Sequence, residues 1–289
     1  MRYGCEILIR YDESGFGIVL KDILQKLGFE PLYFDVFFDE FKKRKEDLSF
    51  DAEKIISLLS NEKPGVVTIK NALYDDLGNN EAYNWVRIRL NIEDGTDETI
   101  GKTFLLNWSN TETLDFLISS QVFTSLLKHE NLIYCYCYDS NDATQQSNTN
   151  YNEFSKEPLP DGVVLTRNDV GDRIIDTAKN WGRMQTVRSV TFMAAPLMWF
   201  GQGFDKVLRL KDLRKFKYAR QEDLEKGPVY IELYQLGEGP SLPENRLRQK
   251  EYWDFLSYHD TIRKYDKANQ VDGIAWYRKR AKQIKMKKK

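Results

Sequence analysis

Three cysteines are the first residues of this chain whose type could support chemistry. Cys135 and Cys137 form a C-x-C pair inside an alternating apolar segment, whereas Cys5 stands alone near the start. A structural zinc site needs four ligands, and no second half of such a set follows the C-x-C pair. An odd number of cysteines also gives no disulfide framework. We therefore predict buried free thiols in a reducing compartment, with no bound metal.

The two histidines also lack partners at catalytic spacing. His129 lies at the expected end of a helix, where a positively charged imidazole interacts favourably with the helix dipole. His259 is followed by Asp260 and preceded by Glu251 and Asp254, but the H-x-x-x-H spacing of a helical zinc site is absent. This arrangement indicates a solvated helix face.

Two glycine pairs, Gly15 with Gly17 and Gly201 with Gly203, could bring backbone close to a phosphate. Each pair lacks the third glycine of a dinucleotide-binding turn and the Gly-Lys-Ser/Thr of a phosphate loop, so we expect turns into helices. No serine stands in a G-x-S-x-G sequence. The sequence therefore assigns no catalytic residue, no cofactor-binding residue and no metal ligand, and it predicts a protein that is not an enzyme.

Any functional site must be positioned by the strands and helices of the fold, which the spacing of apolar residues predicts. We expect strands at 3–11, 30–38, 83–92, 103–108, 132–138 and 229–234, and helices at 16–27, 39–47 (or a charged lead-in), 50–61, 111–129 and 243–266. This pattern predicts an α+β fold, in which mainly antiparallel sheet or sheets pack with amphipathic helices.

A polar stretch divides the chain near its middle. We expect an N-terminal α+β half at 1–139 and a C-terminal α+β half with a helical C-terminus at 158–289, joined by a polar loop at 140–157. The strand–helix–strand pattern at 3–38 resembles the one at 192–235, which suggests two related halves. One continuous domain is the alternative.

Charge is distributed unevenly along the chain. Residues 277–289 hold eight of the 43 Lys/Arg and no acid, so residues 1–276 carry 35 basic against 44 acidic side chains. An acidic body opposes nucleic-acid binding, for which the tail at 277–289 is the one candidate, and it favours a basic protein partner. With no long apolar window and no apolar leader after Met1, we expect no membrane span and a cytoplasmic protein.

Two short pieces of the second half together resemble a known family. The first is DTAKNWGR, which contains Asp176, Asn180, Gly182 and Arg183, and the second is MWFG, made of Met198, Trp199, Phe200 and Gly201. An N-x-G-R turn followed by such an apolar strand, over residues 174–235, resembles the immunity proteins of bacterial polymorphic toxin systems. Trp181 departs from the pattern, since a proline often stands there.

The resemblance implies a non-enzymatic protein that binds a cognate toxin, expected to be basic, and blocks it by direct contact. It implies that the eight motif residues mainly build the fold, and it assigns no toxin-contact residue. Two other classes stay open. One is a carboxylate-dependent enzyme, such as a metal-dependent hydrolase or a nucleotide-processing enzyme, and the other is a different protein-interaction module of phage or bacterial origin.

Overall fold

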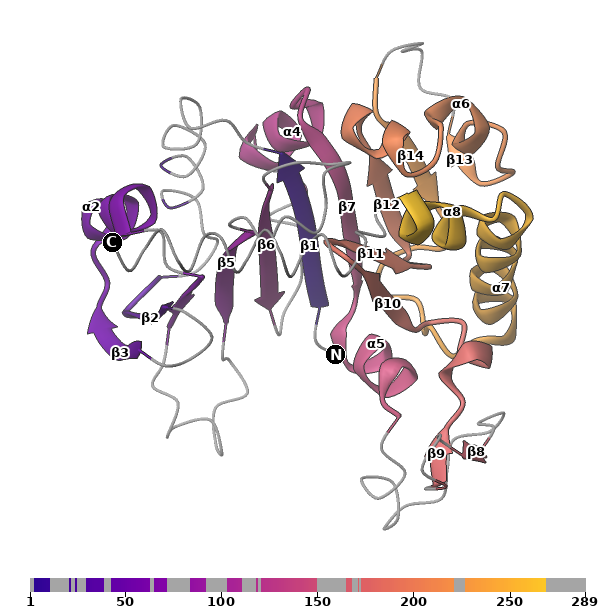
Figure 1. The fold of residues 1–289 in the computed structure, drawn as a ribbon, viewed down its shortest axis with the longest axis horizontal. Helices are drawn as coiled ribbons and strands as arrows, with labels where there is room; N and C mark the ends of the chain where they lie inside the picture. The colour runs from indigo at the N-terminus through magenta and orange to yellow at the C-terminus, as the bar shows by residue number, and fades with distance from the viewer. Residues whose placement is uncertain are drawn as a thin grey trace, which may run out of the picture.

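Ten segments of the chain form one large sheet, which the computed structural model shows across most of the width of the molecule (Figure 1). The structure describes residues 3–10, 21, 24, 30–38, 43–62, 65–71, 84–91, 103–110, 118, 121–149, 165–167, 171, 173–220 and 227–268. The expected helix at 16–27, apart from Lys21 and Leu24, lies outside these residues. The tail at 277–289 and residues 150–157 of the expected loop also lie outside them.

Every neighbouring pair of strands in the large sheet is antiparallel. In spatial order the strands are β13 (Ala219–Arg220), β14 (Val229–Glu232), β12 (Leu197–Phe200), β7 (Leu132–Asp139), β1 (Tyr3–Arg10), β6 (Thr103–Asn110), β5 (Trp85–Asn91), β4 (Val66–Lys70), β2 (Tyr33–Phe38) and β3 (Lys43–Ser49). The expected hairpin is present as β5 and β6, with Arg87 opposite Asn107.

Helices and two small hairpins complete the described fold. The helical segments are α2 (Ala52–Ser57) with the π-helical turn η1 (Leu58–Glu62), α4 (Gln121–Lys128), α5 (Ser140–Ser147), η4 (Thr177–Lys179), η5 (Gln202–Lys206), α6 (Leu210–Leu213), α7 (Pro243–Tyr258) and α8 (Thr261–Ala268). The small hairpins join β8 (Leu165–Arg167) to β9 (Arg173–Ile175) and β10 (Met184–Val187) to β11 (Val190–Met193). The predicted α+β fold with a mainly antiparallel sheet is confirmed.

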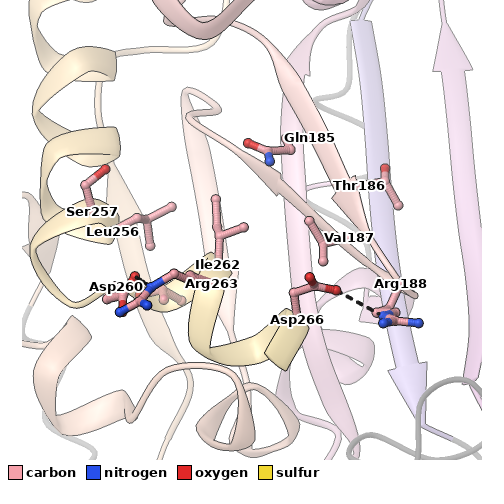
Figure 2. Close-up of a pocket in the computed structure, with 11 residues that line it drawn as sticks. Gln185, Thr186, Val187, Arg188, Leu256, Ser257, Asp260, Ile262, Arg263 and Asp266 are labelled. Atoms are coloured by element: carbon pink, nitrogen blue, oxygen red, sulfur yellow. Dashed lines mark hydrogen bonds and ion pairs between the residues drawn. The ribbon is translucent and has the colours of Figure 1, made fainter. Parts of the chain in front are cut away.

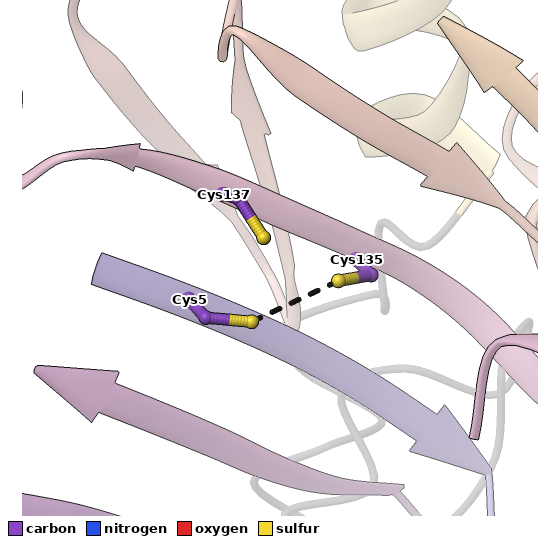
Figure 3. Close-up of side chains that lie close together, drawn as sticks. All are labelled: Cys5, Cys135 and Cys137. Carbon is purple, nitrogen blue, oxygen red and sulfur yellow. Dashed lines mark hydrogen bonds between the residues drawn. The ribbon is translucent and has the colours of Figure 1, made fainter. Parts of the chain in front are cut away.

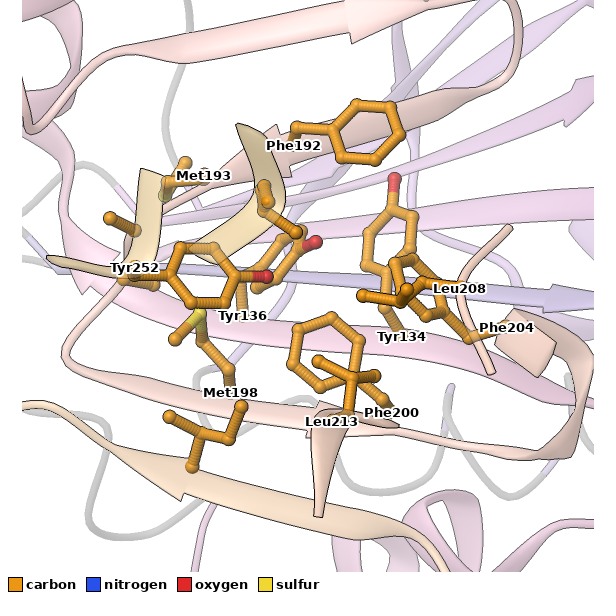
Figure 4. Close-up of a cluster of buried hydrophobic side chains, with 14 of the residues drawn as sticks. Tyr134, Tyr136, Phe192, Met193, Met198, Phe200, Phe204, Leu208, Leu213 and Tyr252 are labelled. Atoms are coloured by element: carbon orange, nitrogen blue, oxygen red, sulfur yellow. The ribbon is translucent and has the colours of Figure 1, made fainter. Parts of the chain in front are cut away.

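The two faces of the sheet form two apolar clusters, because successive strand residues point to opposite sides. One cluster runs along the sheet beneath α2, η1 and α4 and includes Cys5, Cys135 and Cys137. The other lies over β7, β12 and β14, beneath the β10–β11 hairpin and helices α6 to α8. Figure 4 shows its aromatic centre around Tyr134 and Tyr136. β7 contributes to both clusters, as its alternating cysteines and tyrosines predict.

The sheet is continuous across the expected boundary between the halves. β7 pairs with β1 on one edge and with β12 on the other, where Cys135 lies opposite Trp199 and Cys137 opposite Leu197. Strands from 1–139 and from 158–289 therefore share one hydrogen-bonded ladder.

Three expected elements differ in the structure. Residues 140–147 were expected to be loop but form α5, because Asp139 accepts a hydrogen bond from the backbone N–H of Asp142 and caps the helix. Residues 43–49 form the edge strand β3 rather than a helix, and their charged side chains suit an edge that must not pair further. The expected long helix at 243–266 is interrupted at Asp260, whose φ of 53° is incompatible with a continuing helix.

A buried lysine on β4 joins β2 and β3 at the edge of the large sheet that β3 forms. Lys70 on β4 is 1% exposed, and its Nζ lies 2.9 Å from a carboxylate oxygen of Asp35 and 2.6 Å from one of Asp47. Asp47 reaches this position through a bulge in β3, where its φ is 52° and its N–H donates to Asp35 at 2.8 Å. Burial alone would lower the pKa of Lys70, but the hydrogen bonds to the two carboxylates outweigh it and raise the pKa.

We expect Lys70→Met to lower the free energy of unfolding by about 3–5 kcal/mol, because it leaves the buried carboxylate of Asp35 without its cation. Asp47→Asn is the matched control and should cost only about 1 kcal/mol, since Asp47 is half-exposed and asparagine tolerates a positive φ. Urea unfolding measures both. Equal losses in the two variants would contradict this account.

Candidate functional site

The first motif with the family resemblance forms a turn fixed against α5. Asp176 begins η4, and its Oδ1 accepts a hydrogen bond from the N–H of Ala178 at 3.0 Å. Asn180 follows η4 with its side chain buried, and its Nδ2 donates to the backbone carbonyl of Gln146 at 3.0 Å. Buried polar groups that find partners in this way hold a turn in one position.

Gly182 lies where α5 and α7 meet. A Cβ atom at this position would lie 2.6 Å from Nη1 of Arg246 and 2.7 Å from Oδ2 of Asp142. These two side chains form an ion pair with two hydrogen bonds, which joins α7 to α5. Glycine leaves room for that pair, and any side chain would displace it.

Arg183 attaches the same turn to α7. Its guanidinium lies 3.9 Å from the ring centroid of Trp253, and its Nη1 donates to the carbonyl of Asn180 at 3.1 Å. Trp253 in turn donates its Nε1–H to the carbonyl of Trp181 at 2.9 Å. Burial lowers the pKa of Arg183. The turn is thus held between two helices by stacking and by hydrogen bonds.

The second motif lies in β12 at the centre of the second half. Met198 and Phe200 are fully buried in the cluster beneath the hairpin, whereas Trp199 faces the other side and stacks on Tyr230 with 4.8 Å between ring centroids. A Cβ on Gly201 would overlap a backbone carbonyl of β7. All eight motif residues therefore lie in packing or hydrogen-bonding contacts, and none of the eight faces the groove described below.

The motif turn leads directly into the β10–β11 hairpin, which crosses over β7 and β12 in Figure 1. Met184 at the start of β10 donates its N–H to Oγ of Ser147 in α5 at 2.8 Å. Two tyrosines of β7 hold the other strand: Tyr136 donates to the carbonyl of Thr191 at 2.9 Å, and the N–H of Thr191 donates to Tyr134 at 3.3 Å. The hairpin is therefore fixed to the sheet by polar contacts in a buried region.

A buried carboxyl group completes this attachment. Tyr134 donates its hydroxyl hydrogen to Oε1 of Glu6 at 2.8 Å, and Glu6 on β1 is 6% exposed. Burial raises the pKa of Glu6, and hydrogen bonds from Tyr134 and Thr191 together with the charge of Arg89 oppose that rise without cancelling it. The contact between hairpin and sheet thus includes a carboxyl group whose pKa is raised by burial.

A groove of about 630 Å³ lies between β10 and helices α7 and α8 (Figure 2). Four consecutive residues of the hairpin form one wall, and residues from 256 to 266 form the other. Val187, Leu256 and Ile262 make its surface partly apolar. Its volume falls within the range of sites that accept small molecules or peptide side chains.

Two ion pairs flank this groove. Arg188 lies 3.2 Å from Asp266, and Arg263 donates to Asp260 at 2.9 Å, an interaction that lowers the pKa of Asp260. Arg188 and Asp260 also have φ values of 58° and 53°, which are uncommon for residues other than glycine and recur at functional sites.

The three cysteines meet in the core, on the opposite face of the sheet (Figure 3). Their sulfur atoms all lie within 4.8 Å of one another, and Cys5 Sγ is 3.9 Å from Cys135 Sγ. Burial raises the pKa of both of these thiols, which favours the neutral form and packing among apolar neighbours. The prediction of buried free thiols is confirmed. The sequence did not predict that Cys5 would join the C-x-C pair.

The histidines and their neighbouring carboxylates do not gather into one site. His129 accepts the N–H of Asn131 at its Nδ1 at 3.1 Å, which is a local turn contact. His259 packs against the ring of Phe255, with 4.7 Å between centroids. Glu251 pairs with a lysine at 2.6 Å, away from the imidazole.

The groove residues were missed in the sequence because the β10–β11 hairpin was not recognised. Its turn consists of Arg188 and Ser189, without the glycine or asparagine that usually marks a two-residue turn. Without a recognisable turn, the sequence indicated two short strands here only through Val187 and Val190, which flank Arg188 and Ser189.

Comparison with protein-family models, with curated proteins and with solved structures found no significant match. Among the helices that the structure describes, none is long and apolar enough to cross a membrane.

Arg183→Lys should lower the free energy of unfolding by about 1 kcal/mol, because lysine cannot reproduce the planar stack on Trp253. Arg209→Lys is the matched control and should change stability by less than about 0.5 kcal/mol, because Arg209 is exposed and lysine keeps its charge beside Asp212. Urea unfolding distinguishes the two. A loss at Arg183 no larger than the loss at Arg209 would show that the stack does not stabilise the turn.

Glu6→Gln should become increasingly favourable for stability as pH rises above about 4.5, the ordinary value of this carboxyl group. Because the folded pKa is raised, the unfolded chain releases this proton first, so the wild-type contribution is present at low pH and is lost as pH rises through the folded pKa. Thermal unfolding of both proteins across this range gives the difference. The exposed Glu130→Gln serves as control, and a difference independent of pH for Glu6→Gln would refute the assignment.

Proposed function

We propose that this chain is a non-enzymatic immunity protein that binds a cognate bacterial toxin in the cytoplasm and blocks it by direct contact. The observation that carries the proposal is the resemblance of residues 174–235 to immunity proteins of polymorphic toxin systems. Motif residues bond to α5 and stack on α7, and they lead directly into β10. The part of the chain that carries the resemblance therefore also supplies one wall of the groove.

The side chains around the groove suit a protein partner. Arginine residues supply much of the binding energy at protein interfaces, and here Arg188 and Arg263 line the groove. Residues 1–276 carry more acidic than basic side chains, which would attract a basic toxin during its approach. We therefore propose a basic partner and no nucleic-acid ligand.

The carboxylates of the groove argue against the alternative of a carboxylate-dependent enzyme. Its two carboxylates, Asp260 and Asp266, are each paired with an arginine. Arg263 lowers the pKa of Asp260, which suits a permanent ion pair better than proton transfer at neutral pH. Burial raises the pKa of Glu6, but an exposure of 6% leaves little access for a substrate.

Co-expression of this chain with the toxin domain encoded beside its gene should restore growth and yield a stable complex on size-exclusion chromatography. The association rate should fall as salt is raised, because steering between an acidic and a basic surface is screened. A control toxin from an unrelated system should not bind. A neighbouring gene product that is neither toxic nor bound by this chain would overturn the proposal.

A further inference from the structure

The outer edge of β10 has backbone groups that its own hairpin does not use. Val187 and Val190 flank the two-residue turn and are opposite each other, so they form the hydrogen-bonded pair that closes the hairpin. The next pair along the ladder, Thr186 and Thr191, must then direct its backbone N–H and C=O groups away from the partner strand.

The contacts of Thr191 support this assignment. Its N–H and C=O are bonded to the hydroxyl groups of Tyr134 and Tyr136 rather than to β10. The corresponding groups of Thr186 consequently point out of the opposite edge. At the start of β10, the outward N–H of Met184 donates a hydrogen bond to Ser147 of α5. The free edge of β10 therefore begins after Met184.

This edge borders the groove. Gln185, Thr186, Val187 and Arg188 all line it, and Thr186 itself is exposed. Across the groove, the buried hydroxyl of Thr261 has no hydrogen-bond partner in the described part of the chain. An extended backbone at the edge of β10 would therefore meet the N–H and C=O of Thr186, which bond to no other described residue, on one side and a partly apolar wall on the other.

Resting on the function proposed above, we propose that the toxin binds by adding an extended segment of its own chain to the outer edge of β10. The main chain of that segment pairs with Thr186, and its alternate side chains enter the groove between Val187 and Ile262. The two arginines there are already balanced by Asp260 and Asp266, so the entering side chains are apolar or uncharged. Strand addition takes affinity from main-chain bonds and specificity from side-chain pockets.

The two edges of the large sheet suit this role less well. β3 carries Lys43, Arg44 and Lys45 in succession, which would repel a basic partner. β13 has only two residues, Ala219 and Arg220. β10 is the described edge strand that borders a groove of this size, and its use by a second copy of this chain is the competing outcome.

The test compares Thr186→Pro with Thr186→Val in binding to the toxin domain used above. Proline removes the backbone N–H and should weaken binding roughly tenfold or more, whereas valine keeps it and should bind nearly as well as wild type. Equal binding by wild type and by a folded Thr186→Pro variant would overturn strand addition. Failure of the wild type to bind would instead overturn the proposed function.

Hydrogen exchange of the unaltered protein keeps the proposal testable if the proline variant does not fold. The amide of Thr186 should exchange freely in the protein alone and become protected in the complex. An amide that exchanges equally in both states would overturn the proposal. Protection without toxin, together with a concentration-dependent dimer in analytical ultracentrifugation, would overturn it in favour of pairing between two copies.

Discussion

The structure depends on β7 being paired on both edges and covered on both faces. β1 bonds to one edge and β12 to the other, so the segments before and after the polar stretch at 140–157 belong to one ladder. Its cysteines enter one apolar cluster and its tyrosines enter the other. The tyrosine rings pack in the second cluster, and their hydroxyl groups form hydrogen bonds with the backbone of Thr191 in the β10–β11 hairpin. One strand thus determines both the core and the position of the groove wall.

Polar contacts in this protein lie where apolar packing cannot specify a position. Tyr134 and Glu6 fix the position of the short strand β11, whose side chains are buried against the sheet. Lys70 joins two carboxylates at an edge where β3 is too polar to be held by side-chain burial. Arg183 and the ion pair beside Gly182 fix a turn between helices α5 and α7. Such groups are costly when buried alone, so each is surrounded by its partners.

Regular spacing predicted most of the large sheet, and local exceptions account for what was missed. Alternation from Leu132 to Tyr138 predicted β7 and the separation of its cysteines from its tyrosines. It placed Ile133 on the cysteine side, but a register shift between β1 and β7 puts Ile133 in the cluster of the tyrosines. The polar residues 140–147 have no apolar stripe, and their helix depends on a cap at Asp139. The turn at Arg188 has no residue that usually accepts a positive φ, so the hairpin and the groove beside it were not predictable from turn chemistry.

The two walls of the groove come from distant parts of the chain, at 185–188 and 256–266. Domains generally fold as units, and the hairpin shares one buried cluster with side chains of α7 and α8. The groove therefore forms in the same step as this cluster, and only after the ribosome has made residue 266.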